Sequence, residues 1–134
     1  MTFSLWRLLL CVLMGYLIGC ISPSYLIGRK KGYDVRTSGS CNAGASNTVI
    51  MAGKAAGIFV ALFDILKATA ACKLGAVLLP ELEYAWQITG VSCVVGHMFP
   101  VFLGFRGGKG VLCAETMLLI VSFPTGLVSL LIFV

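Results

Sequence analysis

The chain has 134 residues, of which 59% are hydrophobic and only 11% are charged, and its formal net charge is +5. A soluble domain has about 25% charged residues, so this composition excludes an ordinary soluble domain, a disordered segment, a coiled coil and a collagen-like repeat. The length fits one domain, and we expect a single membrane domain over residues 1–134.

The cysteines and the single histidine do not form a metal-binding pattern. The chain has no C-x-x-C pair, and a metal site would need its thiolate and imidazole ligands clustered. We therefore expect the cysteines in apolar segments to pack between helices, and we expect no metal. Cys41 differs, because it lies in a polar loop.

The first apolar segment lies between Arg7 and Arg29 and has 21 uncharged residues. At about 1.5 Å per residue, this length crosses a hydrocarbon core of about 30 Å. Gly15 and Gly19 form a G-x-x-x-G face, which lets another helix approach closely. The segment also resembles a lipoprotein signal ending at Cys20, but the rest of the chain is equally apolar and a lipoprotein would continue into a soluble domain.

Three more apolar segments follow, and together the four predict an all-α, polytopic membrane helix bundle with about four transmembrane helices. Small residues at helical spacing (Gly53, Gly57 and Ala61) lie at the start of the second segment. Polar glycine-rich loops follow the first and third segments, and a short acidic turn follows the second. The later apolar segments are Ala55–Leu79, Tyr84–Phe105 and Val111–Val134.

The charges predict the orientation. The loop over residues 29–54 has five basic residues and one acid, and the loop over residues 104–110 has Arg106 and Lys109. The turn between them has Glu81 and Glu83 and no base. By the positive-inside rule both basic loops face the cytoplasm, and both chain ends lie outside with Arg7 as a mild exception. Because the basic residues follow topology, they do not indicate a nucleic-acid partner.

Both basic loops have the composition of an anion site. In residues 38–47, small residues and glycines can expose successive N–H groups, Ser and Asn add neutral donors, and Arg36 lies beside them. In residues 106–110, glycines and Lys109 precede the start of an apolar helix, where phosphate binds well. Taken singly, the loops could be a helix connection and a positive-inside anchor; together they predict a phosphate site. Gly110 after the lysine excludes a Walker A motif.

Four ionisable residues lie in the apolar segments near these loops. Asp64 and Lys67 are three residues apart, so we expect a local ion pair. Charges inside a membrane usually mark a functional site, but such a pair can also only fix helix packing, and we favour the packing role. His97 could be a base, a donor to an anion, or a packing residue. Glu115 lies within two turns of Lys109 and could neutralise it.

The motifs resemble those of a known family, the bacterial membrane acyl-phosphate:glycerol-3-phosphate acyltransferases (the PlsY family). The likeness covers nearly the whole chain, and the second motif is specific. The matching runs are Pro23-Ser24-Tyr25-Leu26-Ile27-Gly28-Arg29, then Val35-Arg36-x-x-Gly39-Ser40-x-Asn42-x-Gly44-Ala45-x-Asn47, Asp64-Ile65-Leu66-Lys67, and Gly96-His97-x-Phe99-Pro100-x-Phe102-Leu103-x-Phe105-x-Gly107-Gly108-Lys109-Gly110.

The resemblance implies transfer of a fatty acyl group from acyl phosphate to glycerol 3-phosphate in the bacterial inner membrane, with active-site loops facing the cytoplasm and no metal or cofactor. It implies that Ser40, Lys109 and His97 are catalytic. Ser40 would orient the attacking hydroxyl or the phosphate, and the phosphate of the acyl phosphate can itself take the proton. The implied substrate-binding residues are Arg36, Asn42, Asn47, Gly107, Gly108 and Gly110, and the glycine amides would hold phosphate and stabilise the acyl oxygen.

Several positions differ from the family pattern. Ile50 replaces an arginine that contacts phosphate, and the third family motif is not present before Val134. These differences leave open a degenerate or truncated, non-catalytic relative that retains the fold. An anion permease is a weaker alternative, because few charges line a path through the bilayer. Milder differences are Cys41 for glycine, Ser46 for threonine, and Leu112-Cys113 for Ala-Thr.

Overall fold

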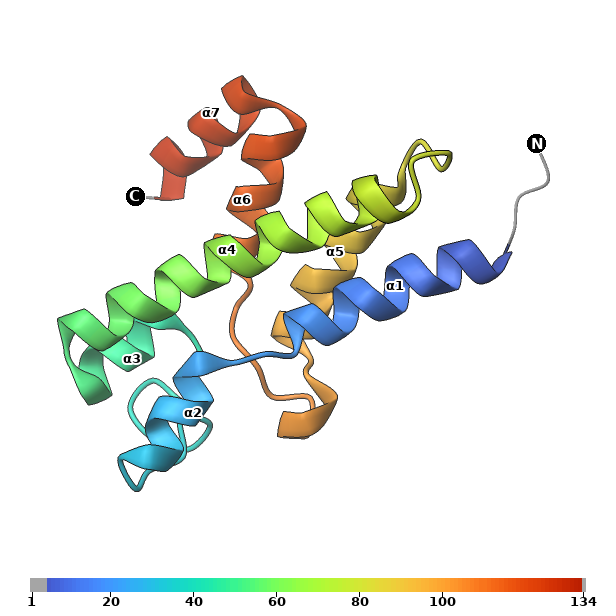
Figure 1. Cartoon of the computed structure of the whole chain (residues 1–134). Coiled ribbons are helices and arrows are strands. Elements are labelled where there is room, and N and C mark those ends of the chain that lie inside the picture. The colour runs from blue at the N-terminus through green and yellow to red at the C-terminus, as the bar shows by residue number, and fades with distance from the viewer. Residues whose placement is uncertain (1–4, 134) are drawn as a thin grey trace.

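The computed structural model describes residues 5–133, and within this range all regular structure is helical (Figure 1). The all-α prediction is therefore confirmed. The elements in chain order are α1 (Leu5–Gly19), α2 (Pro23–Lys30), α3 (Ala45–Ala52), α4 (Lys54–Leu78), α5 (Ala85–Met98), the short 3₁₀ helix η1 (Val101–Leu103), α6 (Val111–Val121) and α7 (Phe123–Phe133).

Three helical segments in the described range are long and apolar enough to cross a membrane, namely residues 5–30, 54–78 and 85–103. Two shorter apolar helices follow at residues 111–121 and 123–132. Helix α1 packs on α5, and α4 packs on α5, α6 and α1, so the long helices form one bundle.

The prediction of a fourth single span is wrong, because residues 111–133 form two helices that fold back on each other (Figure 1). Ser122 is extended, with φ −153° and ψ 104°. Pro124 has no N–H to donate, and its ring would clash with the carbonyl group of Ile120 in a continuous helix. The predicted outer placement of both chain ends concerns residues 1–4 and 134, which lie outside the described residues.

The first apolar segment also breaks, where a continuous span was expected. Helix α1 ends at Gly19 and α2 begins at Pro23, with Ser22 as the N-cap residue between them. The break exposes backbone carbonyl groups that need partners inside a membrane. Lys67 Nζ is the hydrogen-bond partner of two of these carbonyl groups, because it donates to the carbonyl oxygens of Gly19 at 3.3 Å and Ile21 at 2.9 Å.

Close packing of α1 on α5 confirms the predicted role of the G-x-x-x-G face. A Cβ atom at Gly15 would overlap the carbonyl group of Thr89, and one at Gly19 would overlap that of Cys93. The cysteine prediction is also confirmed, since Cys41 alone is exposed. The buried cysteines are Cys11, Cys20, Cys72, Cys93 and Cys113.

The two ends of the bundle differ in charge, because the basic loops lie at one end and the acidic turn lies at the other. At one end the two basic loops meet, and the Ala43 N–H donates to the Gly107 carbonyl at 3.3 Å. At the other end Arg7 forms an ion pair with Glu81, so the residue that broke the positive-inside rule is paired with the acidic turn. The structure thus places the two predicted anion-binding loops together.

Candidate functional site

A small pocket lies where the two basic loops meet the middle of α4, at Asp64, and the end of α5, at His97. Its volume is about 90 Å³, several times the room that one water needs. Predicted site residues from both loops line it together with the single histidine. The lining residues are Asn42, Gly44, Ala45, Ser46, Asp64, His97, Lys109, Gly110, Val111 and Leu112.

Two helix N-termini reach this pocket. Helix α3 begins after Gly44 and α6 begins after Gly110, and neither has a side-chain cap. In α3 the first hydrogen bond of the helix is donated by the Thr48 N–H to the Gly44 carbonyl. In α6 it is donated by the Ala114 N–H to the Gly110 carbonyl. The preceding N–H groups of each helix therefore have no intrahelical acceptor, and the positive ends of two helix dipoles lie at the pocket.

Helix α3 was not predicted, because the whole of residues 29–54 was read as a polar loop. The apolar run Val49-Ile50-Met51-Ala52 behind the polar residues of its first turn was the available indication. The turn at Gly53, with φ 93°, lets α3 pack against the start of α4, where Val49 contacts Gly57. This packing aims the α3 N-terminus at the pocket.

Asn47 holds the first loop in shape. Its buried side chain accepts from the Ser40 N–H at 2.8 Å and donates to the carbonyl oxygens of Val35 at 3.1 Å and Ser38 at 3.0 Å. Both amide N–H groups are thus used within the protein. These contacts favour positioning of the loop by Asn47 over direct contact with a substrate.

Arg36 joins the first loop to η1 and does not line the pocket. Its guanidinium binds both carboxylate oxygens of Asp34, donates to the Leu103 carbonyl at 2.9 Å and lies 5.4 Å from the ring centroid of Tyr25. The hydrogen bonds from Arg36 lower the pKa of Asp34 from 3.8 to about 2. Arg36 is thus a clamp on the loop.

This clamp predicts a pH effect. Because the pKa of Asp34 is lower in the folded protein, its stabilising contribution is complete above pH 3.8 and is lost as the pH falls towards about 2. Wild-type protein should lose more stability than Asp34→Asn over this interval, measured by thermal unfolding in detergent. Equal losses for the two proteins would show that the clamp does not contribute.

The second loop lies directly against the end of α5. The Gly107 N–H donates to the Met98 carbonyl at 3.0 Å, and the Gly108 N–H donates to the His97 carbonyl at 3.1 Å. These two N–H groups are therefore used within the protein, and their binding of phosphate stays a prediction. The free N–H groups at the start of α6 are better placed, and the exposed Lys109 lies beside them.

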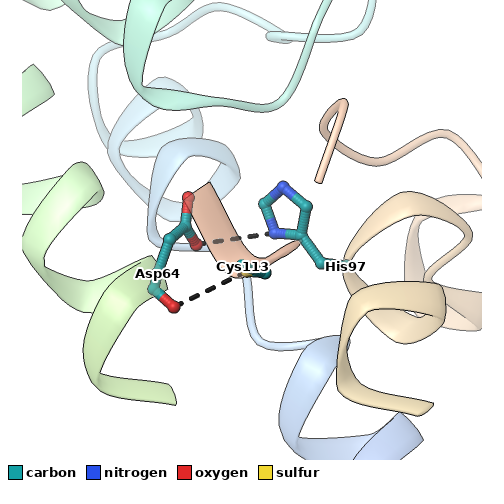
Figure 2. A group of neighbouring side chains, drawn as sticks. All are labelled: Asp64, His97 and Cys113. Carbon is teal, nitrogen blue, oxygen red and sulfur yellow. Dashed lines mark hydrogen bonds and ion pairs between the residues drawn. The ribbon is translucent and has the colours of Figure 1, made fainter. Parts of the chain in front are cut away.

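Asp64 and His97, which line the pocket, form a buried cluster with Lys67, and Cys113 lies at its edge. Figure 2 draws Asp64, His97 and Cys113. Lys67 Nζ lies 2.8 Å from Asp64 Oδ1 and 2.8 Å from His97 Nδ1. Cys113 Sγ contacts the Asp64 carbonyl oxygen at 3.5 Å. The predicted ion pair is confirmed, but the sequence did not predict that His97 joins it.

Asp64, His97 and Cys113 also offer one metal-ligand atom each within 4.8 Å of one another. The Lys67 ammonium contacts the Asp64 and His97 atoms of this group, so a positive charge already lies among these donors. A divalent cation would have to displace that ammonium. This donor set therefore fits an internal ion pair better than a metal site.

Four of the nine predicted site residues line the pocket, and the other five, Ser40 among them, do not. Asn42, His97, Lys109 and Gly110 line the pocket. Ser40 is exposed on the same loop, two residues before Asn42. The remaining predicted residues, Arg36, Asn47, Gly107 and Gly108, lie around the pocket without lining it.

Glu115 does not neutralise Lys109 as expected. It is buried on α6, and its Oε1 accepts from Ser129 on α7 at 2.6 Å. Among the described residues, no ion pair joins it to Lys109. Glu115 instead links the two helices of the hairpin.

Comparison with known proteins places the chain in a family. Residues 9–134 match the profile of a family described as glycerol-3-phosphate acyltransferase. A glycerol-3-phosphate acyltransferase of Desulfotalea psychrophila is 44% identical over 124 residues, which cover 90% of this chain and 63% of the relative. One from Oceanobacillus iheyensis is 38% identical over 125 residues, which cover 88% of this chain and 60% of the relative.

The chain is also similar in sequence and fold to two solved structures of a glycerol 3-phosphate acyltransferase. A crystal structure of PlsY (YgiH), an integral membrane glycerol 3-phosphate acyltransferase in its glycerol 3-phosphate form, is 37% identical with a TM-score of 0.80, covering 92% of this chain and 62% of that one. The lysophosphatidic acid form is 36% identical with a TM-score of 0.77, covering 92% of this chain and 61% of that one.

The chain spans about three fifths of the length of the curated relatives it matches first. The match nevertheless runs through both loops of the pocket and the helices that hold them. This chain is an integral membrane protein and belongs to the glycerol-3-phosphate acyltransferase family.

Proposed function

We propose that this chain transfers a fatty acyl group from acyl phosphate to the 1-hydroxyl of glycerol 3-phosphate, which gives lysophosphatidic acid for phospholipid synthesis. The observation that carries the proposal is the convergence of two uncapped helix N-termini with Lys109 and His97 at one pocket. Such a pocket favours a phosphate group. The relatives' crystal forms with glycerol 3-phosphate and lysophosphatidic acid support the same chemistry.

The residues of the pocket suggest a division of roles. Lys109 and the N–H groups that begin α6 would bind phosphate and stabilise negative charge on the acyl oxygen. Ser40 would orient the attacking hydroxyl. The hydroxyl oxygen forms a bond to the acyl carbon, the carbon–oxygen bond to phosphate breaks, and the leaving phosphate takes the hydroxyl proton. The bilayer holds the acyl chain.

The test uses the chain reconstituted in liposomes with acyl phosphate and labelled glycerol 3-phosphate. We expect lysophosphatidic acid and inorganic phosphate in equal amounts, and no product when acyl-CoA replaces acyl phosphate. Ser40→Ala should reduce the rate at least about tenfold, as the loss of an orienting hydrogen bond does. Ser38→Ala, two residues earlier on the same loop, is the matched control, because the family motif leaves that position open.

One observation favours a second candidate, a non-catalytic relative that binds anions. Ile50, at the position of the family's arginine, is exposed on α3 and offers no charge to a phosphate. Well-inserted protein that binds glycerol 3-phosphate but forms no product would support this candidate and contradict the acyltransferase proposal.

For the orientation, we propose a bacterial inner membrane with both basic loops on the cytoplasmic side. Because Cys41 is the exposed cysteine of the first loop, it reports the side directly. A membrane-impermeant maleimide should label the protein in inverted vesicles and not in intact spheroplasts, and Cys41→Ser should abolish the labelling. Labelling of spheroplasts would reverse the orientation.

A further inference from the structure

Lys67 has three N–H bonds, and the structure provides three acceptors in hydrogen-bond geometry. They are the carbonyl oxygens of Gly19 and Ile21, at 3.3 and 2.9 Å, and His97 Nδ1 at 2.8 Å. The two carbonyl groups cannot donate, so the Lys67 protons must point at them. The same ammonium therefore directs its remaining N–H bond to the imidazole ring.

Asp64 keeps Lys67 charged. Its Oδ1 lies 2.8 Å from Lys67 Nζ, and both side chains are almost completely buried. This oxygen has no hydrogen bond of good geometry, so it contributes through its charge. A neutral lysine would leave the carboxylate buried without a counter-charge, which is strongly unfavourable.

A charged lysine fixes the role of His97 Nδ1. If Nδ1 had a proton, its N–H would face an N–H of Lys67, whose Nζ lies 2.8 Å from Nδ1. The distance from Nδ1 to Asp64 Oδ1 is 3.5 Å, which is too long for a good hydrogen bond. Nδ1 must then be the acceptor. In a neutral imidazole with Nδ1 as acceptor, the proton is on Nε2.

The other ring nitrogen points away from Asp64 (Figure 2). Nε2 lies directly against Gly108, where a Cβ atom would overlap it, and His97 lines the pocket beside Lys109 and Asn42. Within residues 5–133, Nε2 has no hydrogen-bond partner, and this atom is not fully buried. Its N–H is therefore open to the pocket.

We propose that Lys67 is a positioning residue that holds neutral His97 in the Nε2–H tautomer, so that His97 donates a hydrogen bond to an oxyanion in the pocket and does not serve as a base. The tautomer follows from the buried cluster alone. The identity of the acceptor as a phosphate or acyl oxygen rests on the proposed function. Of the alternatives that the sequence left open for His97, this selects the donor.

The experiment uses the fact that the chain has a single histidine. The 134-residue chain with ¹⁵N-labelled histidine and lysine, purified without a histidine tag and placed in lipid nanodiscs, should give one unprotonated, pyridine-type Nδ1 and one protonated, pyrrole-type Nε2 at neutral pH. A through-space correlation should join Nδ1 to a lysine Nζ. A protonated Nδ1, alone or in an imidazolium, would overturn the proposal, and so would the absence of that correlation.

Two variants on α4 test the positioning. Lys67→Met should shift both ring signals to values averaged between the tautomers, whereas Lys73→Met, an exposed lysine on the same helix, should leave them unchanged. An unchanged tautomer in Lys67→Met would show that Lys67 does not set it.

A titration separates this inference from the proposed function. Glycerol 3-phosphate should shift the Nε2 resonance and leave Nδ1 unprotonated. Binding without any change at Nε2 would overturn the donor role. No binding by a protein that has the expected tautomer would contradict the proposed function and leave the assignment of Lys67 intact.

Discussion

Lys109→Met is expected to weaken glycerol 3-phosphate binding by about 10- to 150-fold. Among the described residues that line the pocket, Lys109 is the only lysine, since the buried Lys67 is paired with Asp64 and does not line it. A hydrogen bond to a charged group contributes about 1.5–3 kcal/mol. Methionine keeps most of the side-chain length and removes the charge. Titration calorimetry in nanodiscs measures the change.

The matched control is Lys54→Met. Lys54 is exposed at the start of α4 and does not line the pocket, so its replacement lowers the net charge equally without touching the site. We expect a change of less than about twofold at physiological salt, where charges beyond about 8 Å are screened. Equal losses in both variants would show that the protein attracts the anion by general charge alone, and would contradict the pocket.

Much of this architecture was predictable because a membrane imposes simple constraints on sequence. Long uncharged segments, small-residue faces such as Gly15 and Gly19, and the distribution of basic residues each have one physical explanation. The basic residues predict that the two glycine-rich loops lie on the same side of the membrane. The contact of Ala43 with Gly107 confirms that the two loops meet.

The breaks in the apolar segments were harder to predict, since apolar length alone does not show where a helix stops. Pro23 and Pro124 mark both breaks, and the sequence contains them plainly. A break within a membrane also needs a partner for its free carbonyl groups. That partner, Lys67, comes from a helix 46 residues further along the chain.

The cluster around Lys67 shows the limit of sequence reasoning most clearly. The spacing of Asp64 and Lys67 predicts a local ion pair, but not which third residue faces it. His97 reaches them only because α5 packs on α4 and α1. The same packing explains Gly107 and Gly108 of the second loop, whose N–H groups donate to carbonyl groups at the end of α5.

Gly108→Ala is expected to reduce both glycerol 3-phosphate binding and turnover, with turnover falling about 100-fold. The added methyl group would overlap His97 Nε2 and approach the Ala43 carbonyl oxygen at 3.1 Å, so the ring or the loop must move. Displacing a positioned group by about 1 Å can cost about 100-fold in rate. Extra volume in a packed site also destabilises by about 1–3 kcal/mol.

Gly32→Ala separates these effects from the general cost of replacing glycine. Gly32 has φ 82° and open space around it, so alanine there costs about 1–2 kcal/mol of backbone strain without entering the pocket. Binding by Gly32→Ala should match the wild type. In Gly108→Ala the single histidine should shift its Nε2 signal, because the methyl group occupies the space beside that atom. Wild-type binding together with an unchanged Nε2 signal would contradict the close approach of Gly108 to His97, and with it the placement of the second loop over the end of α5.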